Sequence, residues 1–185
     1  MLLSPLLLVI AVAVLVSSGR PILYRQTRVG RFGTPFTMLK FRSMEIDAHD
    51  RVHELHDHNE RRGPLFKIHQ DPRVTPVGWF LRFTSLDELP QLCNVLGGTM
   101  SLVGPRPALY EERKNFPTGL LEREQVRPGI TGLWQVEARL DPDFDEYHRL
   151  DLEYVRNWTL WLDLRLLCRT PVVILRDSLR HLREH

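Results

Sequence analysis

The chain has 185 residues and a formal net charge of only +2, which excludes a dedicated nucleic-acid-binding domain and leaves a mild preference for anionic partners such as phosphates or membrane headgroups. With 43% hydrophobic and 26% charged residues, most of the chain is expected to fold as one domain of ordinary size. The two cysteines, Cys93 and Cys168, have no metal-site spacing and form no disulfide framework, so the composition is compatible with a reducing compartment.

The first segment, MLLSPLLLVIAVAVLV (1–16), carries no charge. As a helix it would reach about 24 Å, short of a ~30 Å hydrocarbon core, and Pro5 would kink or break it. The first basic residue, Arg20, follows the apolar run, whereas a secretory signal peptide has its basic region first. We therefore predict a membrane-embedded segment, with the arginines after it placing the rest of the chain in the cytoplasm. A signal peptide and a buried core helix are the alternatives.

Residues 20–44 alternate short apolar and polar stretches around Gly30 and Gly33, which predicts two strands joined by a hairpin near GRFGTP. Residues 45–62 are polar and have a helical pattern. Four histidines lie there: His49, His53, His56 and His58. His49 and His53 have the i, i+4 spacing that metal ligands sometimes show. No partnering Cys and no H-E-x-x-H pattern accompanies these histidines, so a solvated helix or flap is favoured over a zinc site.

The next expected helix runs from Ser85 to the Gly97-Gly98 pair. Its first residues, Ser85-x-x-Glu88, match a capping box, and Asp87 lies inside that box. The face expected to be buried is formed by Leu89, Leu92, Val95 and Leu96.

Two prolines flank Arg106 in SLVGPRPAL (101–109), so the backbone there is expected to be stiff. Residues 109–125 are predicted to form a charged helix, 126–136 a loop or strand, and 143–169 a helical region. The C-terminal stretch interleaves arginines with apolar residues, which suits an amphipathic helix on a membrane surface or, equally, one on a protein core. The chain is therefore predicted to be α+β: mainly helical, with a short β-hairpin.

Asp87 and Glu88 are the first candidates for chemistry. Neighbouring residues of a helix point about 100° apart, so the two carboxylates are expected to have different roles. The first turn of a helix favours an ionised carboxylate and also binds anions, so Asp87 could act as a nucleophile near a phosphate. The basic residues considered as phosphate ligands are Lys40, Arg42, Arg82, Arg106 and Arg127. The spacing alone does not decide between this chemistry and a pair that merely starts a helix.

Several blocks of the chain closely resemble the bacterial sugar transferase family, the monotopic phosphoglycosyl transferases or polyprenyl-phosphate hexose-1-phosphate transferases. The resemblance runs from residue 2 to about residue 175. Its blocks are LLSPLLLVIA, RQTRVGRFGTPFTMLKFRSM, DPRVTPVGWFLRFTSLDELPQLCNVLGGTMSLVGPRP, RPGITGLWQV and YVRNWTLWLDLRLLCRTP.

The resemblance implies that Asp87 attacks the sugar-bearing phosphorus of a UDP-sugar, releases UMP and forms an aspartyl-linked sugar phosphate. A polyprenyl (undecaprenyl) phosphate would then accept the sugar phosphate, the first membrane step of exopolysaccharide, O-antigen or capsule biosynthesis. Glu88 would carry the family's Mg²⁺-binding role. Lys40, Arg82 and Arg106 match phosphate-site positions, and Arg127 matches the nucleotide end.

In that family a re-entrant membrane helix is broken at a Ser-Pro pair, which Ser4-Pro5 matches. Residues 1–19 would then be the second half of this re-entrant hairpin, whose first half is missing, by truncation or because the true start lies upstream. Residues 20–185 would form the catalytic domain on the cytoplasmic face of the inner membrane, with amphipathic helices at the lipid interface. The chain departs from the family at Thr99, where an acidic residue is common, and at Cys93, where an aromatic residue is usual.

The expected partners are a UDP-sugar, undecaprenyl phosphate and membrane lipid, without nucleic acid. Association with a second copy of the chain is left open. The alternatives to an active transferase are a catalytically inactive partner subunit of a full-length relative and a soluble hydrolase. No residue decides which sugar is transferred.

Overall fold

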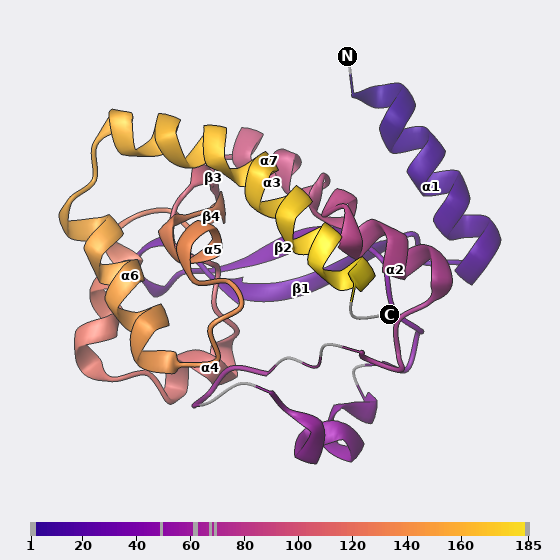
Figure 1. Ribbon diagram of the computed structural model, residues 1–185, viewed down its shortest axis with the longest axis horizontal. Helices are drawn as coiled ribbons and strands as arrows, with labels where there is room; N and C mark the ends of the chain where they lie inside the picture. The colour runs from indigo at the N-terminus through magenta and orange to yellow at the C-terminus, as the bar shows by residue number, and fades with distance from the viewer. Residues whose placement is uncertain (1–2, 49, 61–62, 67, 69, 184–185) are drawn as a thin grey trace.

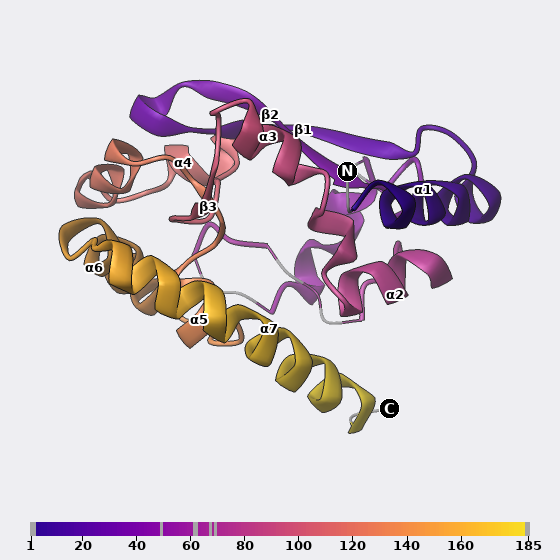
Figure 2. The ribbon, with the colours of Figure 1, turned by 90° about the horizontal axis from the view of Figure 1, so that it is seen from above.

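The computed structural model describes residues 3–48, 50–60, 63–66, 68 and 70–183. The described chain is mainly helical with short strands, which confirms the predicted α+β class (Figure 1). In Figure 2 the hairpin of strands β1 (Leu23–Val29) and β2 (Pro35–Phe41) runs along one side of the molecule. The long helix α7 (Leu160–Arg183) runs along the opposite side, with the shorter elements between them. The site is built from these shorter elements.

The predicted hairpin is confirmed. β1 (Leu23–Val29) pairs antiparallel with β2 (Pro35–Phe41), and a single turn of 3-10 helix, η1 (Arg31–Gly33), joins them. The register places Lys40 opposite Tyr24, near the end of β2. This end of the hairpin lies next to helices α1 (Ser4–Ser18) and α2 (Pro76–Phe83) (Figure 2).

The apolar N-terminal segment forms α1 (Ser4–Ser18). Pro5 lies in its first turn, where a backbone N–H has no partner within the helix in any case, so the proline starts the described helix rather than breaking it. Ile10 and Val14 are buried in a cluster with Phe41, while Val16 on another side is 81% exposed. One face of α1 therefore packs against the domain, and much of its remaining apolar surface is uncovered. Within the described ranges, no helix is long and apolar enough to cross a membrane.

The single helix predicted for residues 85–98 is wrong. The segment forms a three-residue 3-10 turn, η3 (Leu86–Glu88), and a separate short helix, α3 (Gln91–Leu96). The expected buried face is also wrong, because Leu96 is 88% exposed whereas Gln91 and Asn94 are buried. Asn94 is buried because its amide bonds strand β2: it accepts from the Leu39 N–H (3.1 Å) and donates to the Thr37 carbonyl (2.8 Å).

Helix α2 (Pro76–Phe83) precedes the 3-10 turn and brings it to the hairpin. Thr75 caps this helix by accepting a hydrogen bond from the Gly78 N–H. Gly78 lies so close to the chain after β2 that a Cβ there would be 1.8 Å from the Ser43 carbonyl oxygen. Only glycine permits this approach, which sets the position of the residues that follow α2.

The remaining segments differ from the prediction mainly at prolines and helix boundaries. The helix predicted for 109–125 is wrong as one unit, because it divides at Pro117, and the region 143–169 divides near Trp158. The observed elements are η2 (Asp50–His58), β3 (Ser101–Val103), α4 (Tyr110–Lys114), η4 (Thr118–Gln125), β4 (Gly129–Thr131), α5 (Leu133–Glu137) and α6 (Phe144–Arg156). β3 and β4 form a parallel two-stranded sheet that the sequence did not indicate.

The histidine-bearing segment 45–62 is only partly described. Its regular part is the 3-10 helix η2 rather than an α-helix, and His53 and His58 on it are exposed. His49 and the side chain of His56 lie outside the described residues.

The main core lies between η4, α5, α6 and α7. Its most deeply buried side chains include Leu120, Tyr147 and Leu166. Leu166 and Val173 hold the inner face of α7 on this core, while Trp161 on the same helix is 72% exposed. The C-terminal helix is therefore amphipathic, with its inner face on the protein core and an apolar outer face that the described residues leave uncovered.

Candidate active site

The acidic turn, Ser85–Glu88, connects α2 to α3. Ser85 adopts a left-handed backbone (φ 56°), which is costly for a residue with a side chain, and its hydroxyl caps no helix. The predicted capping box is therefore wrong. The unusual backbone turns the chain sharply after α2, so that Asp87 is buried, only 8% exposed, while Glu88 lies against β2.

Glu88 pairs with Lys40. The Lys40 Nζ donates to Glu88 Oε1 at 2.6 Å, across 48 residues of sequence. Burial raises the pKa of Glu88, but the Lys40 charge and hydrogen bond outweigh it and hold the pKa below its usual value. Glu88 is therefore ionised at neutral pH.

Asp87 has a different environment. Among the contacts of the described residues, none is a hydrogen bond or ion pair to its carboxylate. Burial, together with the charge of the neighbouring Glu88, raises the pKa of Asp87 to about 6 against the opposing charges of Lys40 and Arg82. The expectation that a helix start would favour the ionised form is thus corrected: a three-residue turn offers few N–H groups, and desolvation dominates. Two adjacent carboxylates with pKa values pushed apart are typical of sites that assign them different roles.

Several basic residues act on this pair. Arg82, exposed in the last turn of α2, acts electrostatically on Asp87, and Arg106, between β3 and α4, acts on Glu88. Arg139, just after α5, lowers the pKa of both carboxylates. The sequence reasoning missed Arg139, since nothing in its local pattern distinguishes it and only the tertiary fold brings it near residues 50 positions earlier in the chain.

Two other sequence candidates lie elsewhere. Arg127 is exposed, and no contact recorded for the described residues joins it to Asp87 or Glu88. Arg42 is buried and donates to the Ser18 and Gly19 carbonyls, so it closes the C-terminal end of α1 instead of facing the acidic turn.

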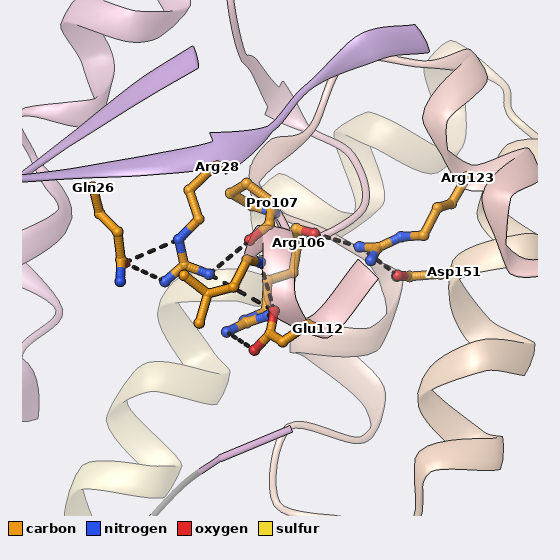
Figure 3. A network of polar contacts seen from close by, with 8 residues as sticks. Gln26, Arg28, Arg106, Pro107, Glu112, Arg123 and Asp151 are labelled. Carbon is orange, nitrogen blue, oxygen red and sulfur yellow. Dashed lines mark hydrogen bonds and ion pairs between the residues drawn. The ribbon is translucent and has the colours of Figure 1, made fainter. Parts of the chain in front are cut away.

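Arg106 belongs to a group of buried ion pairs that we call the arginine network, formed by Arg28, Arg106, Glu112, Arg123 and Asp151 (Figure 3). Its guanidinium donates from Nη1 to Glu112 Oε2 (3.0 Å) and from Nη2 to Glu112 Oε1 (3.2 Å). Arg123 pairs with Asp151 at 2.8 Å and also donates to the Arg106 carbonyl. Both the backbone and the side chain of Arg106 are therefore held in place.

The oxygen donors of the acidic turn fit a hard divalent cation. The structure describes no group of three or more His, Cys, Asp or Glu side chains that could hold a metal. Mg²⁺, however, is often bound by one or two carboxylates together with the phosphates of a substrate. The unpaired Asp87 carboxylate and the second oxygen of Glu88 are compatible with that mode of binding.

The chain is similar in sequence to known proteins of one family. Residues 1–177 match the family model described as bacterial sugar transferase. The chain is 45% identical over 158 residues to the galactosyl transferase CpsE of Streptococcus agalactiae, covering 85% of this chain and 35% of that protein. It is also 45% identical over 166 residues to the undecaprenyl-phosphate galactose phosphotransferase of Salmonella typhimurium (85% and 34% covered).

A third relative is the UDP-glucose:undecaprenyl-phosphate glucose-1-phosphate transferase of Escherichia coli, 43% identical over 178 residues and covering 92% of this chain and 36% of that protein. The chain thus spans about a third of the length of each of these three relatives.

Proposed function

Because this chain belongs to the bacterial sugar transferase family, we propose that it transfers a sugar 1-phosphate from a UDP-sugar to undecaprenyl phosphate. Two relatives are named as an undecaprenyl-phosphate galactose phosphotransferase and a UDP-glucose:undecaprenyl-phosphate glucose-1-phosphate transferase, which supports this reaction class. The observation that carries the proposal is the buried Asp87 carboxylate without a recorded partner, adjacent to a Glu88 that is ionised by Lys40.

The proposed reaction has two displacements at one phosphorus. An Asp87 carboxylate oxygen attacks the phosphorus that bears the sugar, a new P–O bond forms, and the bond to the UMP oxygen breaks with its electron pair leaving on UMP. A phosphate oxygen of undecaprenyl phosphate then attacks the same phosphorus. The Asp87–phosphorus bond breaks, the carboxylate is regenerated, and the product is an undecaprenyl diphosphate sugar.

The environment of Asp87 supports a nucleophilic role. With a pKa of about 6 the group is largely ionised at pH 7 and above, yet it lacks the hydrogen bonds that would otherwise stabilise the carboxylate. A poorly solvated anion gives up little stabilisation when it forms a bond. Lys40, Arg82 and Arg106 surround the pair with positive charge that would attract the diphosphate and stabilise the charge that develops on it.

Mg²⁺ is proposed as the cofactor, with Glu88 as its protein ligand. When bound, the ion would offset negative charge on the diphosphate. The role of the protein is to keep Glu88 ionised, which the 2.6 Å contact with Lys40 achieves.

The proposed location is the cytoplasmic face of the inner membrane. The uncovered apolar side of α1 and the outer face of α7 support contact with lipid, because a soluble domain rarely exposes so many large apolar side chains. Ser4 and Pro5, at the start of α1, remain the proposed break of a re-entrant helix.

The test is UMP release by the purified, detergent-solubilised chain from a panel of UDP-glucose, UDP-galactose and UDP-N-acetylglucosamine, with undecaprenyl phosphate and Mg²⁺. We expect UMP release from at least one of these UDP-sugars. We expect Asp87→Asn to lower UMP release at least ~10³-fold and to remove the covalent intermediate, because the nucleophile is lost. Asp47→Asn, at an exposed aspartate, is the control and should retain wild-type release. Undiminished release by Asp87→Asn would refute the mechanism. An inactive wild-type chain that co-purifies with a full-length relative would indicate a partner subunit instead.

A further inference from the structure

We propose that Glu112 is a positioning residue that holds the guanidinium of Arg106 with one edge turned toward the reacting phosphates. This inference rests on the proposed function and deepens it, since it assigns a role in anion binding to a carboxylate outside the acidic turn.

The contact between Arg106 and Glu112 uses one edge of the guanidinium, and the Tyr147 hydroxyl also lies near this side chain. A guanidinium has two edges that can each bind an oxyanion through two N–H groups. Glu112 occupies the terminal edge, through Nη1 and Nη2. The other edge, formed by Nε and one Nη, has the same two-donor geometry and matches a phosphate. The Arg106 side chain is also partly exposed, so that a substrate can reach it.

Glu112 is itself fixed from several sides. It is 4% exposed, it lies in the first turn of α4, and its Oε2 accepts a hydrogen bond from the Leu109 N–H at 2.7 Å. Arg28 Nη1 lies 3.9 Å from the same oxygen, and that guanidinium is anchored by the Pro107 carbonyl (3.0 Å) and by Gln26. Figure 3 shows Arg28 and Arg106 converging on this one carboxylate. A carboxylate held this firmly defines the direction of the arginine that it binds.

The charges of Arg28, Arg106 and Glu112 do not balance. Two arginines share one carboxylate, so one positive charge remains without an ionised partner inside the group. Burial, together with the charge of Arg106, lowers the pKa of Arg28 to about 10, so both arginines stay charged at neutral pH. An anion beside Arg106 would neutralise the excess, and a diphosphate is the anion that the proposed reaction supplies.

The main chain at Arg106 is equally constrained. Pro105 and Pro107 flank it, and Arg123, paired with Asp151, donates to its carbonyl. A cavity of only about 20 Å³ lies beside Arg106 and Arg123, room for one water molecule. The arginine therefore has little freedom to turn away if Glu112 is intact.

The experiment is a double-mutant cycle on Glu112 and Arg106, with two readouts. The first is calorimetric binding of inorganic pyrophosphate in Mg²⁺-free buffer to the full, detergent-solubilised chain. The second is kcat/KM for UMP release. Glu112→Gln keeps the size of the side chain but removes its charge, and we expect ~10–100-fold weaker pyrophosphate binding and a similar loss of kcat/KM, the range typical when a carboxylate that orients a ligand is removed.

The decisive comparison is the double variant. If Glu112 acts through Arg106, Glu112→Gln adds little further loss in the Arg106→Met background. Glu112→Asp, which retains the charge but shortens the side chain, should lie between wild type and Glu112→Gln. Glu124→Gln is the matched control, because Glu124 binds Arg113 through a similar two-bond contact (2.6 and 3.0 Å) without contacting Arg106, and we expect it to leave both readouts unchanged.

Unchanged pyrophosphate binding in Glu112→Gln, or losses that simply add in the double variant, would overturn the inference. So would a wild-type chain that does not bind pyrophosphate. A wild-type chain that binds pyrophosphate in a Glu112-dependent way but releases no UMP from any UDP-sugar would support the inference while refuting the proposed function.

Discussion

The acidic turn and the arginine network both bury carboxylates, and they provide opposite environments for them. In the network, Glu112 and Asp151 each contact at least one arginine. In the turn, Glu88 is paired with Lys40, but the neighbouring Asp87 is buried with no hydrogen bond or ion pair recorded for it among the described residues. Each carboxylate of the network therefore has a cationic partner, whereas in the acidic turn only Glu88 has one among the described residues.

This difference predicts where the fold loses stability when its carboxylates are ionised. A buried carboxylate without a partner is unfavourable, whereas one that is paired and hydrogen-bonded is tolerated. Unsatisfied groups in otherwise well-paired proteins are concentrated at reactive sites, and the rigid network next to the turn is what can offset the cost. Three substitutions, in decreasing order of expected effect, test this comparison.

The largest effect is expected from Asp151→Asn in the network. Removing one member of a buried ion pair leaves the charge of Arg123 without its partner, which typically costs about 3–5 kcal/mol of unfolding free energy. Burial raises the pKa of Asp151 to about 6 despite Arg123, so the test is denaturant unfolding at pH 8, where the pair is ionised. Glu153→Gln, on the exposed side of the same helix, should change stability by less than about 0.5 kcal/mol. A loss equally small for Asp151→Asn would contradict the stabilising role of the network.

The second effect is expected from Lys40→Met in the acidic turn. Without this charge the pKa of both Glu88 and Asp87 rises, and the diphosphate loses a cationic partner, so we expect kcat/KM at pH 7 to fall ~10²–10³-fold. The pH profile should also change. Wild-type kcat/KM should decrease as the pH falls below about 6, where Asp87 becomes protonated, and in Lys40→Met this decrease should begin at a higher pH.

UMP release measured between pH 5 and 8.5 tests both statements. Lys114→Met, which removes an exposed lysine paired with Glu111, serves as the control and should keep the wild-type profile. A Lys40→Met profile that coincides with wild type would show that the Lys40–Glu88 pair does not govern the ionisation of Asp87.

The smallest effect is expected for the unfolding free energy of Asp87→Asn, and here the substitution should raise stability instead of lowering it. Because the folded-state pKa of Asp87 is raised, its neutral form stabilises the fold below pH ~4, and this stability is lost as the pH rises through about 6. An uncharged asparagine avoids that loss. We expect the inactive variant to be about 1–3 kcal/mol more stable than wild type at pH 8 and to show no such gain at pH 4. Denaturant unfolding at the two pH values checks this, and a destabilised variant at pH 8 would show that the carboxylate has a stabilising partner.

The hairpin and most members of the charged group at the acidic turn were predictable from sequence, whereas Arg127 lies apart from that group and the role of the group in catalysis stays a prediction. The hairpin followed from apolar alternation around Gly30 and Gly33, and the family blocks identified Asp87, Glu88, Lys40, Arg82 and Arg106 as site candidates, which the structure brings into one charged group. The capping box and the continuous helix were wrong. A local pattern cannot show that Ser85 adopts a left-handed backbone or that Asn94 is buried, because bonds to the distant strand β2 decide both the orientation and the burial of α3.

The sequence by itself determined the family, the elements with strong periodicity and the residue types at the acidic turn, because these depend on short-range patterns and on blocks of residues at fixed spacing. Only the tertiary structure decided which carboxylate is paired and which is not. It also placed Arg139 near the turn and made Glu112 the partner of Arg106. Burial and charge pairing depend on how the fold brings groups together, and the pKa values of Asp87 and Glu88 are set mainly by desolvation and by Lys40, which lies in a distant strand.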